Sequence, residues 1–223
     1  TELCYEAAVY PIPAQEPFSM SKLMYRSSVQ VIAHNLKNLS AMLKVAARNA
    51  RSRGIEPSVL LNSRLAPDMF PLLRQVQIVT DNAKGCCARL AGVQPPVFED
   101  DETTFAELEA RIKRTLAFLR GLKAADFVGS ESREVVMTIP LGDLRFSGID
   151  YMNGWALPNF YFHLTTAYNI LRHNGVPLGK LDFLGAVPGM QMSGKIAKMM
   201  GVKTGAKAKT KAKTKAKEAS KKT

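Results

Sequence analysis

The sequence predicts an all-α protein, a bundle of four long helices with one short β-hairpin inserted before the last of them. Apolar residues recur at the helical spacing of ~3.6 residues over four long stretches. The spacing changes to alternation only once, between the third and fourth of these stretches. A hydrophobic content of 46% is ordinary for a protein with a packed core. In this arrangement we expect a long crossover to join the third and fourth helices.

The first helix is expected over residues 22–53. Its apolar stripe runs from Val29 to Ala50 at helical spacing, and Gly54 supplies the stop. His34 lies opposite the stripe, so we expect its imidazole to face solvent.

The second helix is expected to begin at Pro67-Asp68, because proline suits a first helical turn and aspartate favours the positive end of the helix dipole. It should end at Gly92. Cys86 and Cys87 fall within its apolar arc and are interpreted as small buried side chains rather than a redox pair. With Cys4 they form neither a disulfide framework nor a zinc-ligand spacing, which favours a reducing, cytoplasmic location.

The third helix begins at Thr104, which forms a capping box with Glu107, and continues to about Leu122. Alternating apolar residues then predict a β-hairpin over about 133–147, with Gly142-Asp143 marking its turn.

The fourth helix is expected over residues 151–174, and Pro158 should start its regular part or kink it. Gly175 supplies its stop. His173 lies in the last turn and points away from the core, whereas His163 falls on the flank of the apolar stripe.

The chain divides into three parts by composition. Residues 1–19 are proline-rich and are expected to form a loosely ordered lead-in; because Met20-Ser21 resembles a translation start, they are interpreted as an upstream extension. Residues 20–200 form the bundle domain, and residues 201–223 an Ala/Lys-rich tail expected to be disordered. The lead-in lacks a secretory pattern, and no apolar run is long enough for a membrane span.

The basic character of the chain belongs mainly to the tail. The net charge is +12; from Val202 onward, nine lysines and one glutamate contribute +8, which leaves +4 for the remainder. The tail could bind nucleic acid non-specifically by neutralising phosphates, or it could serve only as a solubilising extension. Its candidate phosphate contacts are Lys207, Lys209, Lys211, Lys213, Lys215 and Lys217.

A candidate polar pocket lies between the second and fourth helices. Gln75 and His163 occupy equivalent flanks of their helices, which favours one shared pocket. Asn159 stands one turn before His163, and Asp68 and Tyr168 are further candidates. The alternative interpretation is a histidine at the core margin whose ring is hydrogen-bonded to a polar neighbour.

Three long runs resemble the DinB-like superfamily of bacterial four-helix bundles, also described as DinB/YfiT-like metalloenzymes. They are LLNSRLAPDMFPLLRQVQIVTDNAKG, RLAGVQPPVFEDDETTFAELEARI and ALPNFYFHLTTAYNILRHNGVPLGKLDFLG. Within the superfamily the chain looks like an uncharacterised family of unknown function. The resemblance covers roughly residues 20–185 and implies the four-helix bundle and a homodimer.

The resemblance also implies where a metal site would lie. Many members bind a divalent metal through a histidine on the second helix and an H-x-x-x-H pair on the fourth, and some use it to activate a thiol cofactor or water. The matching positions here are Gln75, Asn159 and His163, so two of the three imidazoles are absent. An amide oxygen is a poor substitute for a zinc or nickel ligand.

These patterns lead to one functional prediction and one alternative. The prediction is a cytoplasmic bundle with a degenerate metal site, which binds a small ligand or has a stress-related accessory role. The alternative is a metal- or thiol-dependent transferase or isomerase that uses a changed ligand set around His163, with zinc or nickel as the ion.

Overall fold

The computed structural model describes residues 19–190 and Lys195. Within them, positions up to Gly185 belong to one compact unit and the few that follow belong to a second. The basic tail and, apart from Ser19, the predicted lead-in lie outside the described residues. In the described part of the chain, every helix is too short or too polar to span a bilayer.

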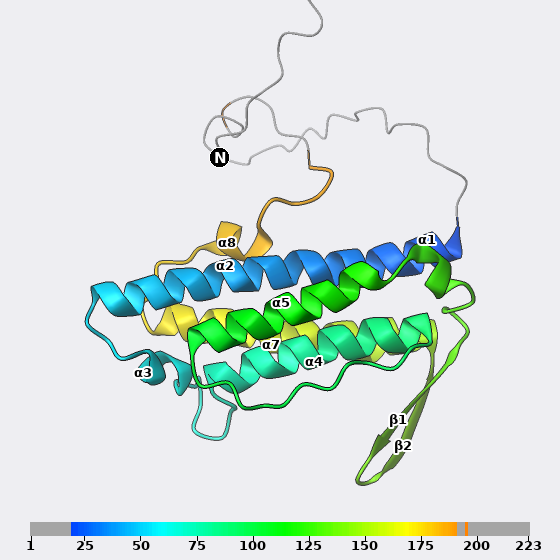
Figure 1. The fold of residues 1–223 in the computed structure, drawn as a ribbon, viewed down its shortest axis with the longest axis horizontal. Coiled ribbons are helices and arrows are strands. Elements are labelled where there is room, and N and C mark those ends of the chain that lie inside the picture. Colours follow the sequence, from blue (N-terminus) through cyan, green and yellow to red (C-terminus); the bar gives the residue numbers. More distant parts are fainter. Residues whose placement is uncertain (1–18, 191–194, 196–223) are drawn as a thin grey trace, which may run out of the picture. The chain divides into compact units, whose positions relative to one another are not determined.

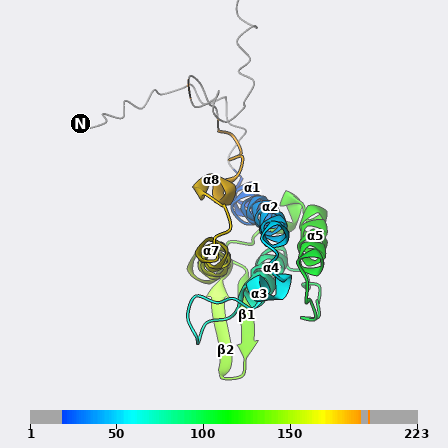
Figure 2. The ribbon, with the colours of Figure 1, turned by 90° about the vertical axis from the view of Figure 1, so that its left-hand side faces the viewer.

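Four long helices lie side by side in the larger unit (Figures 1 and 2). They are α2 (Val31–Ser52), α4 (Leu72–Ala91), α5 (Phe105–Gly121) and α7 (Leu157–His173). α4 packs against both α5 and α7, which lie on opposite sides of the unit (Figure 2). This mostly helical architecture, with a single described hairpin, confirms the predicted fold class at that level.

The long crossover joins α4 to α5, so the prediction that it joins the third and fourth helices is wrong. In Figure 1, α4 and α5 run in the same direction, and residues 92–104 return along the length of the unit between them. Two parallel helices require such a return. The β-hairpin leaves and re-enters at one end, so it can only connect antiparallel helices.

The first predicted helix forms as one run with a π-helical segment inside it. The run consists of α1 (Met20–Tyr25), η1 (Arg26–Gln30) and α2. Ser28 in η1 is fully buried and donates its hydroxyl proton to the carbonyl of Met24 at 2.6 Å. Gly54, with φ of 64°, follows the end of α2 as predicted.

α4 begins at Leu72, so the predicted start at Pro67-Asp68 is wrong. Pro71 occupies the N-cap position with an extended ψ of 166°. A proline disfavours helical geometry for the preceding Phe70 and lacks the N–H that a helix interior requires. The short α3 (Pro57–Leu61) precedes this turn-rich segment.

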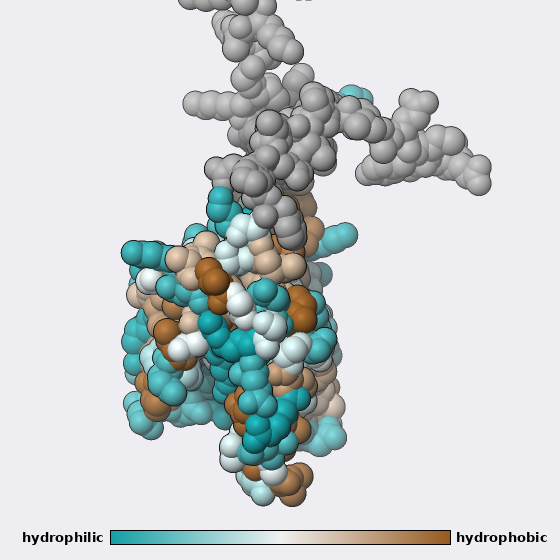
Figure 3. All heavy atoms as spheres, turned by 90° about the vertical axis from the view of Figure 1, so that its right-hand side faces the viewer, coloured by the Kyte–Doolittle hydropathy of each residue, from teal (hydrophilic) through white to brown (hydrophobic). Residues whose placement is uncertain are grey.

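The hairpin predicted over about 133–147 is confirmed. Its strands are β1 (Glu134–Ile139) and β2 (Gly142–Ser147). Because Ile139 pairs with Gly142, the turn is Pro140-Leu141 rather than Gly142-Asp143. Leu141 is 95% exposed. Figure 3 shows hydrophilic residues along the hairpin and hydrophobic ones at its far end.

The last predicted helix also contains a π-helical segment. After the 3-10 turn η2 (Ala124–Phe127) and the hairpin, α6 (Gly148–Asp150) and η3 (Tyr151–Ala156) lead into α7. Pro158 lies in the first turn of α7, which confirms that the regular part starts there.

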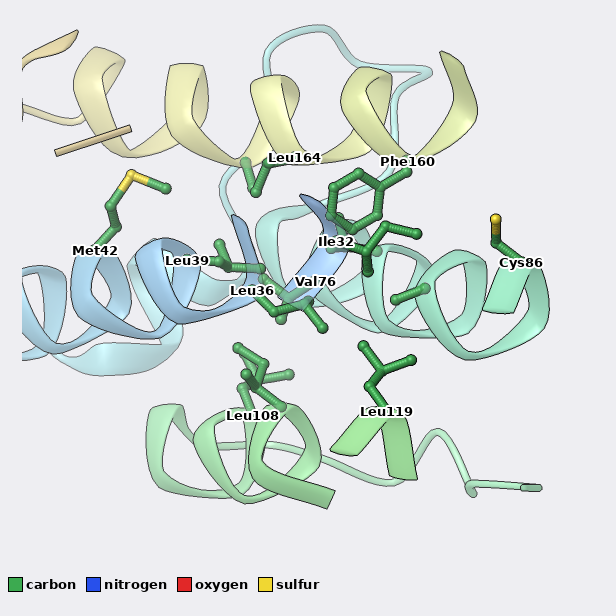
Figure 4. Packing of buried hydrophobic residues seen from close by; sticks show 14 of the residues in the cluster. Ile32, Leu36, Leu39, Met42, Val76, Cys86, Leu108, Leu119, Phe160 and Leu164 are labelled. Carbon is green, nitrogen blue, oxygen red and sulfur yellow. The ribbon is translucent and has the colours of Figure 1, made fainter. Parts of the chain in front are cut away.

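The core is built from the apolar stripes of all four long helices. Figure 4 shows them meeting, with residues of α2 and α4 between those of α5 and α7; the labelled side chains are Ile32, Leu36, Leu39, Met42, Val76, Cys86, Leu108, Leu119, Phe160 and Leu164. All ten are at most 1% exposed. The stripes therefore account for the helix packing.

The prediction that the imidazole of His34 faces solvent is wrong, because its ring is hydrogen-bonded to another segment of the protein. Its Nε2 lies 2.7 Å from the carbonyl oxygen of Leu184, at the end of α8 (Lys180–Leu184). Asn38, one turn later, donates to the carbonyl oxygen of Phe183 at 3.0 Å. The prediction failed because α8, which covers this face of α2, is too short to be recognised from apolar spacing.

Candidate functional site: a histidine held by a buried glutamine

The structure brings Gln75 of α4 and His163 of α7 together. The Oε1 atom of Gln75 lies 2.7 Å from Nδ1 of His163. Gln75 is buried at 1% exposure, and His163 is half-buried. The side-chain Nε2 of Gln75 donates to the carbonyl oxygen of Phe70 at 3.0 Å. That carbonyl belongs to the turn in front of α4.

These two hydrogen bonds together determine the proton position on the imidazole. Because the amide nitrogen of Gln75 donates to Phe70, its oxygen is directed at His163 and must accept there. Nδ1 of His163 is therefore the protonated nitrogen, and Nε2 carries the lone pair. Among the described residues, no protein atom is hydrogen-bonded to Nε2.

The surroundings of His163 also favour its neutral form. Burial lowers its pKa below the ordinary value of 6.5, and the charge of Arg74 lowers it further. At neutral pH the side chain is therefore an uncharged base with an available lone pair. Such a nitrogen can accept a hydrogen bond or a proton from a bound molecule.

The other three predicted pocket residues are not joined to this pair. Asn159 donates its amide to the carbonyl of Trp155, one turn earlier in the chain, at 2.7 Å. Asp68 is exposed in the turn-rich segment before α4. Tyr168 packs edge-on against Phe183 of α8, with ring centroids 5.6 Å apart.

The residues present do not fit the metal centre that the superfamily resemblance implies. The only imidazole at the matching positions is that of His163, and its Nδ1 is occupied by Gln75. Within the described residues, no group of three or more His, Cys, Asp or Glu side chains could hold an ion. Amide oxygens are weak ligands for zinc-like metals.

Sequence reasoning missed a second polar centre around Arg111 of α5, which is fully buried. Its Nε donates to the hydroxyl of Thr80 at 2.7 Å. Its Nη atoms reach the carboxylates of Asp81 at 2.7 Å, Asp100 at 2.9 Å and Glu102 at 3.1 Å. The guanidinium thus ties the crossover to α4 and α5.

Two further arginines extend the Arg111 cluster. Arg74 of α4 pairs with Asp100 and donates to Gln77 at 3.1 Å. Burial works to raise the pKa of Asp100, but Arg74 and Arg111 outweigh it and hold that pKa below its ordinary value. Arg114 lies over the ring of Phe98, 4.6 Å from its centroid.

The sequence contained a signal for this cluster. Arg111 stands three residues after Leu108 and one before Ile112, inside the apolar stripe of the third long helix. A charged residue there must be paired when buried, and the acidic run Glu99–Glu102 lies close in sequence.

The two cysteines on α4 are buried, as predicted. Burial raises the pKa of the Cys87 thiol well above its ordinary value, so it is not activated as a thiolate.

The structure is a helical domain with a small hairpin and a histidine–glutamine pair between its second and fourth long helices. These features define a class of protein fold but do not specify an activity. The family model of DUF1993, a domain of unknown function, matches residues 24–184. The chain therefore belongs to this family. No protein with a curated description matches it.

A solved structure places the family in a wider group. The chain is similar to the crystal structure of a DinB family member protein from Shewanella denitrificans, with 42% sequence identity and a TM-score of 0.72. The match covers 77% of this chain and 97% of that one. This chain is thus a DinB-like domain of unknown function, which confirms the resemblance found in the sequence.

Proposed function

We propose that the protein is a DinB-like four-helix bundle that binds a small ligand at a degenerate metal site. The observation that supports this most directly is the 2.7 Å hydrogen bond between Gln75 Oε1 and His163 Nδ1. In this proposal glutamine replaces a metal-binding histidine on α4 and holds His163 in one tautomer. Nε2 of His163 then accepts a hydrogen bond from the ligand.

Metal analysis of protein purified without a histidine tag tests this proposal. We expect far less than one zinc or nickel ion per chain. The double variant Gln75→His with Asn159→His should bind metal that the natural protein does not, because histidines at i and i+4 on one helix face can chelate one ion. Stoichiometric metal in the natural protein, lost on His163→Ala, would instead support a metalloenzyme with an altered ligand set.

A second candidate is an enzyme that uses His163 as a general base for transfer or isomerisation. The lowered pKa of His163 and the lone pair on its Nε2 favour this role. His163→Gln should then abolish turnover of a bound substrate while leaving the fold intact, whereas a purely binding role predicts no turnover in either protein.

The basic tail carries a separate proposal, non-specific association with nucleic acid. Nine lysines against one glutamate from Val202 onward support it. DNA binding should weaken steeply with salt, with a slope of ~0.9 per phosphate neutralised, and should be lost when residues 202–223 are removed. Equal binding by the truncated protein contradicts this proposal.

A further inference from the structure

A cavity of about 650 Å³ lies between the C-terminal half of α2, the start of α3 and the first turns of α5. These elements adjoin at one end of the unit in Figure 1. α4 and α7 contribute no residue to the lining. The cavity is therefore separate from the Gln75–His163 pair. Its volume falls in the range of ~300–1,000 Å³ typical of small-molecule sites.

The walls offer apolar surface from all three sides. Ala47 comes from α2, Ile55 and Pro57 from the segment at the start of α3, and Phe105 and Ala106 from the first turn of α5. Phe105 is 5% exposed and packs in the core behind the wall, so the accessible apolar surface comes mainly from the other four residues. A hydrocarbon or aromatic body would bury this surface.

Two cations on facing helices border the cavity, Arg51 and Lys113. Arg51 of α2 and Lys113 of α5 are both exposed, and neither makes a salt bridge within the described residues. Of the two carboxylates in the lining, Glu109 lies 3.7 Å from the ammonium group of Lys44. Glu56, the other carboxylate, makes no ion pair with a cation of the described residues.

We propose that this cavity binds a small amphipathic organic anion, with an aromatic or alkyl body and one carboxylate or sulfonate group. The apolar walls hold the body, and Arg51 and Lys113 attract the charged head from two sides. Glu56 opposes negative charge, so a single charge on the ligand is favoured over two. Nothing in this assignment depends on the function proposed for His163.

Two fluorescent probes test the proposal with the full-length protein. Anilinonaphthalene sulfonate carries an aromatic body and one negative charge, whereas N-phenylnaphthylamine has a similar body without charge. We expect the anionic probe to bind with one site per chain and more tightly than the neutral one. Ala106→Trp fills the cavity from an exposed position on α5 and should abolish binding. Ala110→Trp, exposed on the same helix but outside the cavity, is the matched control.

Charge variants separate the contribution of the probe's charged group to affinity from that of its aromatic body. Arg51→Met or Lys113→Met should lower the affinity for the anionic probe by about five- to tenfold and leave the affinity for the neutral probe unchanged. Lys37→Met, exposed on α2 outside the cavity, should change neither. Glu56→Gln should raise the affinity for the anionic probe, because it removes the negative charge that repels the probe.

Three outcomes would overturn the proposal. The first is unchanged binding of the anionic probe to Ala106→Trp. The second is equal affinity of the natural protein for the two probes. The third is a lower affinity of Glu56→Gln for the anionic probe. The Arg51 and Lys113 variants keep the test decisive if Ala106→Trp lowers stability, because both side chains are exposed and make no ion pair in the described structure.

Discussion

At the scale of single residues, Gln75 has the largest chemical consequence in the candidate site. It is buried, and its two amide atoms are both used, one toward Phe70 and one toward His163. A buried amide with both ends satisfied holds its orientation, which in turn fixes the tautomer of the neighbouring imidazole. The hydrogen bond at the core margin, one of the two sequence-based interpretations, is present in the structure.

His163→Ala should lower the free energy of unfolding by about 1–3 kcal/mol, because the oxygen of buried Gln75 loses its partner. Urea denaturation measures this directly. His173→Ala removes an exposed imidazole from the same helix and should have almost no effect. Equal stability of the two variants would show that the Gln75 contact contributes nothing.

The lowered pKa of His163 predicts a pH dependence of stability. The unfolded chain takes up a proton near pH 6.5, whereas the folded protein still holds His163 neutral there. The free energy of unfolding should therefore be fully retained above about pH 6.5 and decline as pH falls below it. His163→Gln should lack this decline. An NMR titration midpoint for His163 at or above 6.5 would contradict the assignment.

At the scale of elements, the Arg111 cluster decides how the crossover is held. Residues 92–104 form no helix or strand, yet Arg111 contacts both Asp100 and Glu102 and so links the crossover to α4 and α5. Arg74 adds an ion pair to Asp100, and Arg114 adds one to Glu102. The Glu102 side chain is 3% exposed, so its charge depends on its arginine partners, of which Arg111 is fully buried.

Arg111→Met should destabilise the protein by about 3–5 kcal/mol, because it leaves the buried carboxylate of Glu102 without its main partner. Hydrogen exchange should increase in residues 94–104 before it does so in the long helices. Arg120→Met is the matched control: this side chain is exposed on the same helix and makes no ion pair within the described residues, so its loss should cost well under 1 kcal/mol. A crossover equally protected in both variants would show that Arg111 does not hold it.

At the scale of the whole molecule, the predicted homodimer requires apolar side chains that remain exposed in the single chain. Phe160 is 1% exposed and belongs to the core, and Trp155 packs against Phe146, with ring centroids 6.0 Å apart. Phe162, at 57% exposed, is the aromatic residue of α7 that the fold leaves uncovered. A symmetric dimer would bury it.

We expect light scattering to give a dimer at concentrations on the order of micromolar, with α7 in the interface. Phe162→Glu should shift the protein to a monomer without loss of helical content. Leu141→Glu at the exposed hairpin turn introduces the same charge elsewhere and should leave the dimer intact. A wild-type protein that is cleanly monomeric would refute this prediction.

The sequence by itself determined the four long helices apart from the start of α4, the two strands of the hairpin and the Gln75–His163 flank positions, because apolar spacing and capping residues act over a few neighbours. Thr104 and Glu107 form the expected capping box, for example. The tertiary structure decided the direction of α5, the partner of His34 and the partners of Arg111. Each of these depends on segments far apart in the chain, and local periodicity carries no information on which of them meet. The place of Arg111 inside an apolar stripe signals its burial, but only the packing supplies its partners Asp81, Asp100 and Glu102.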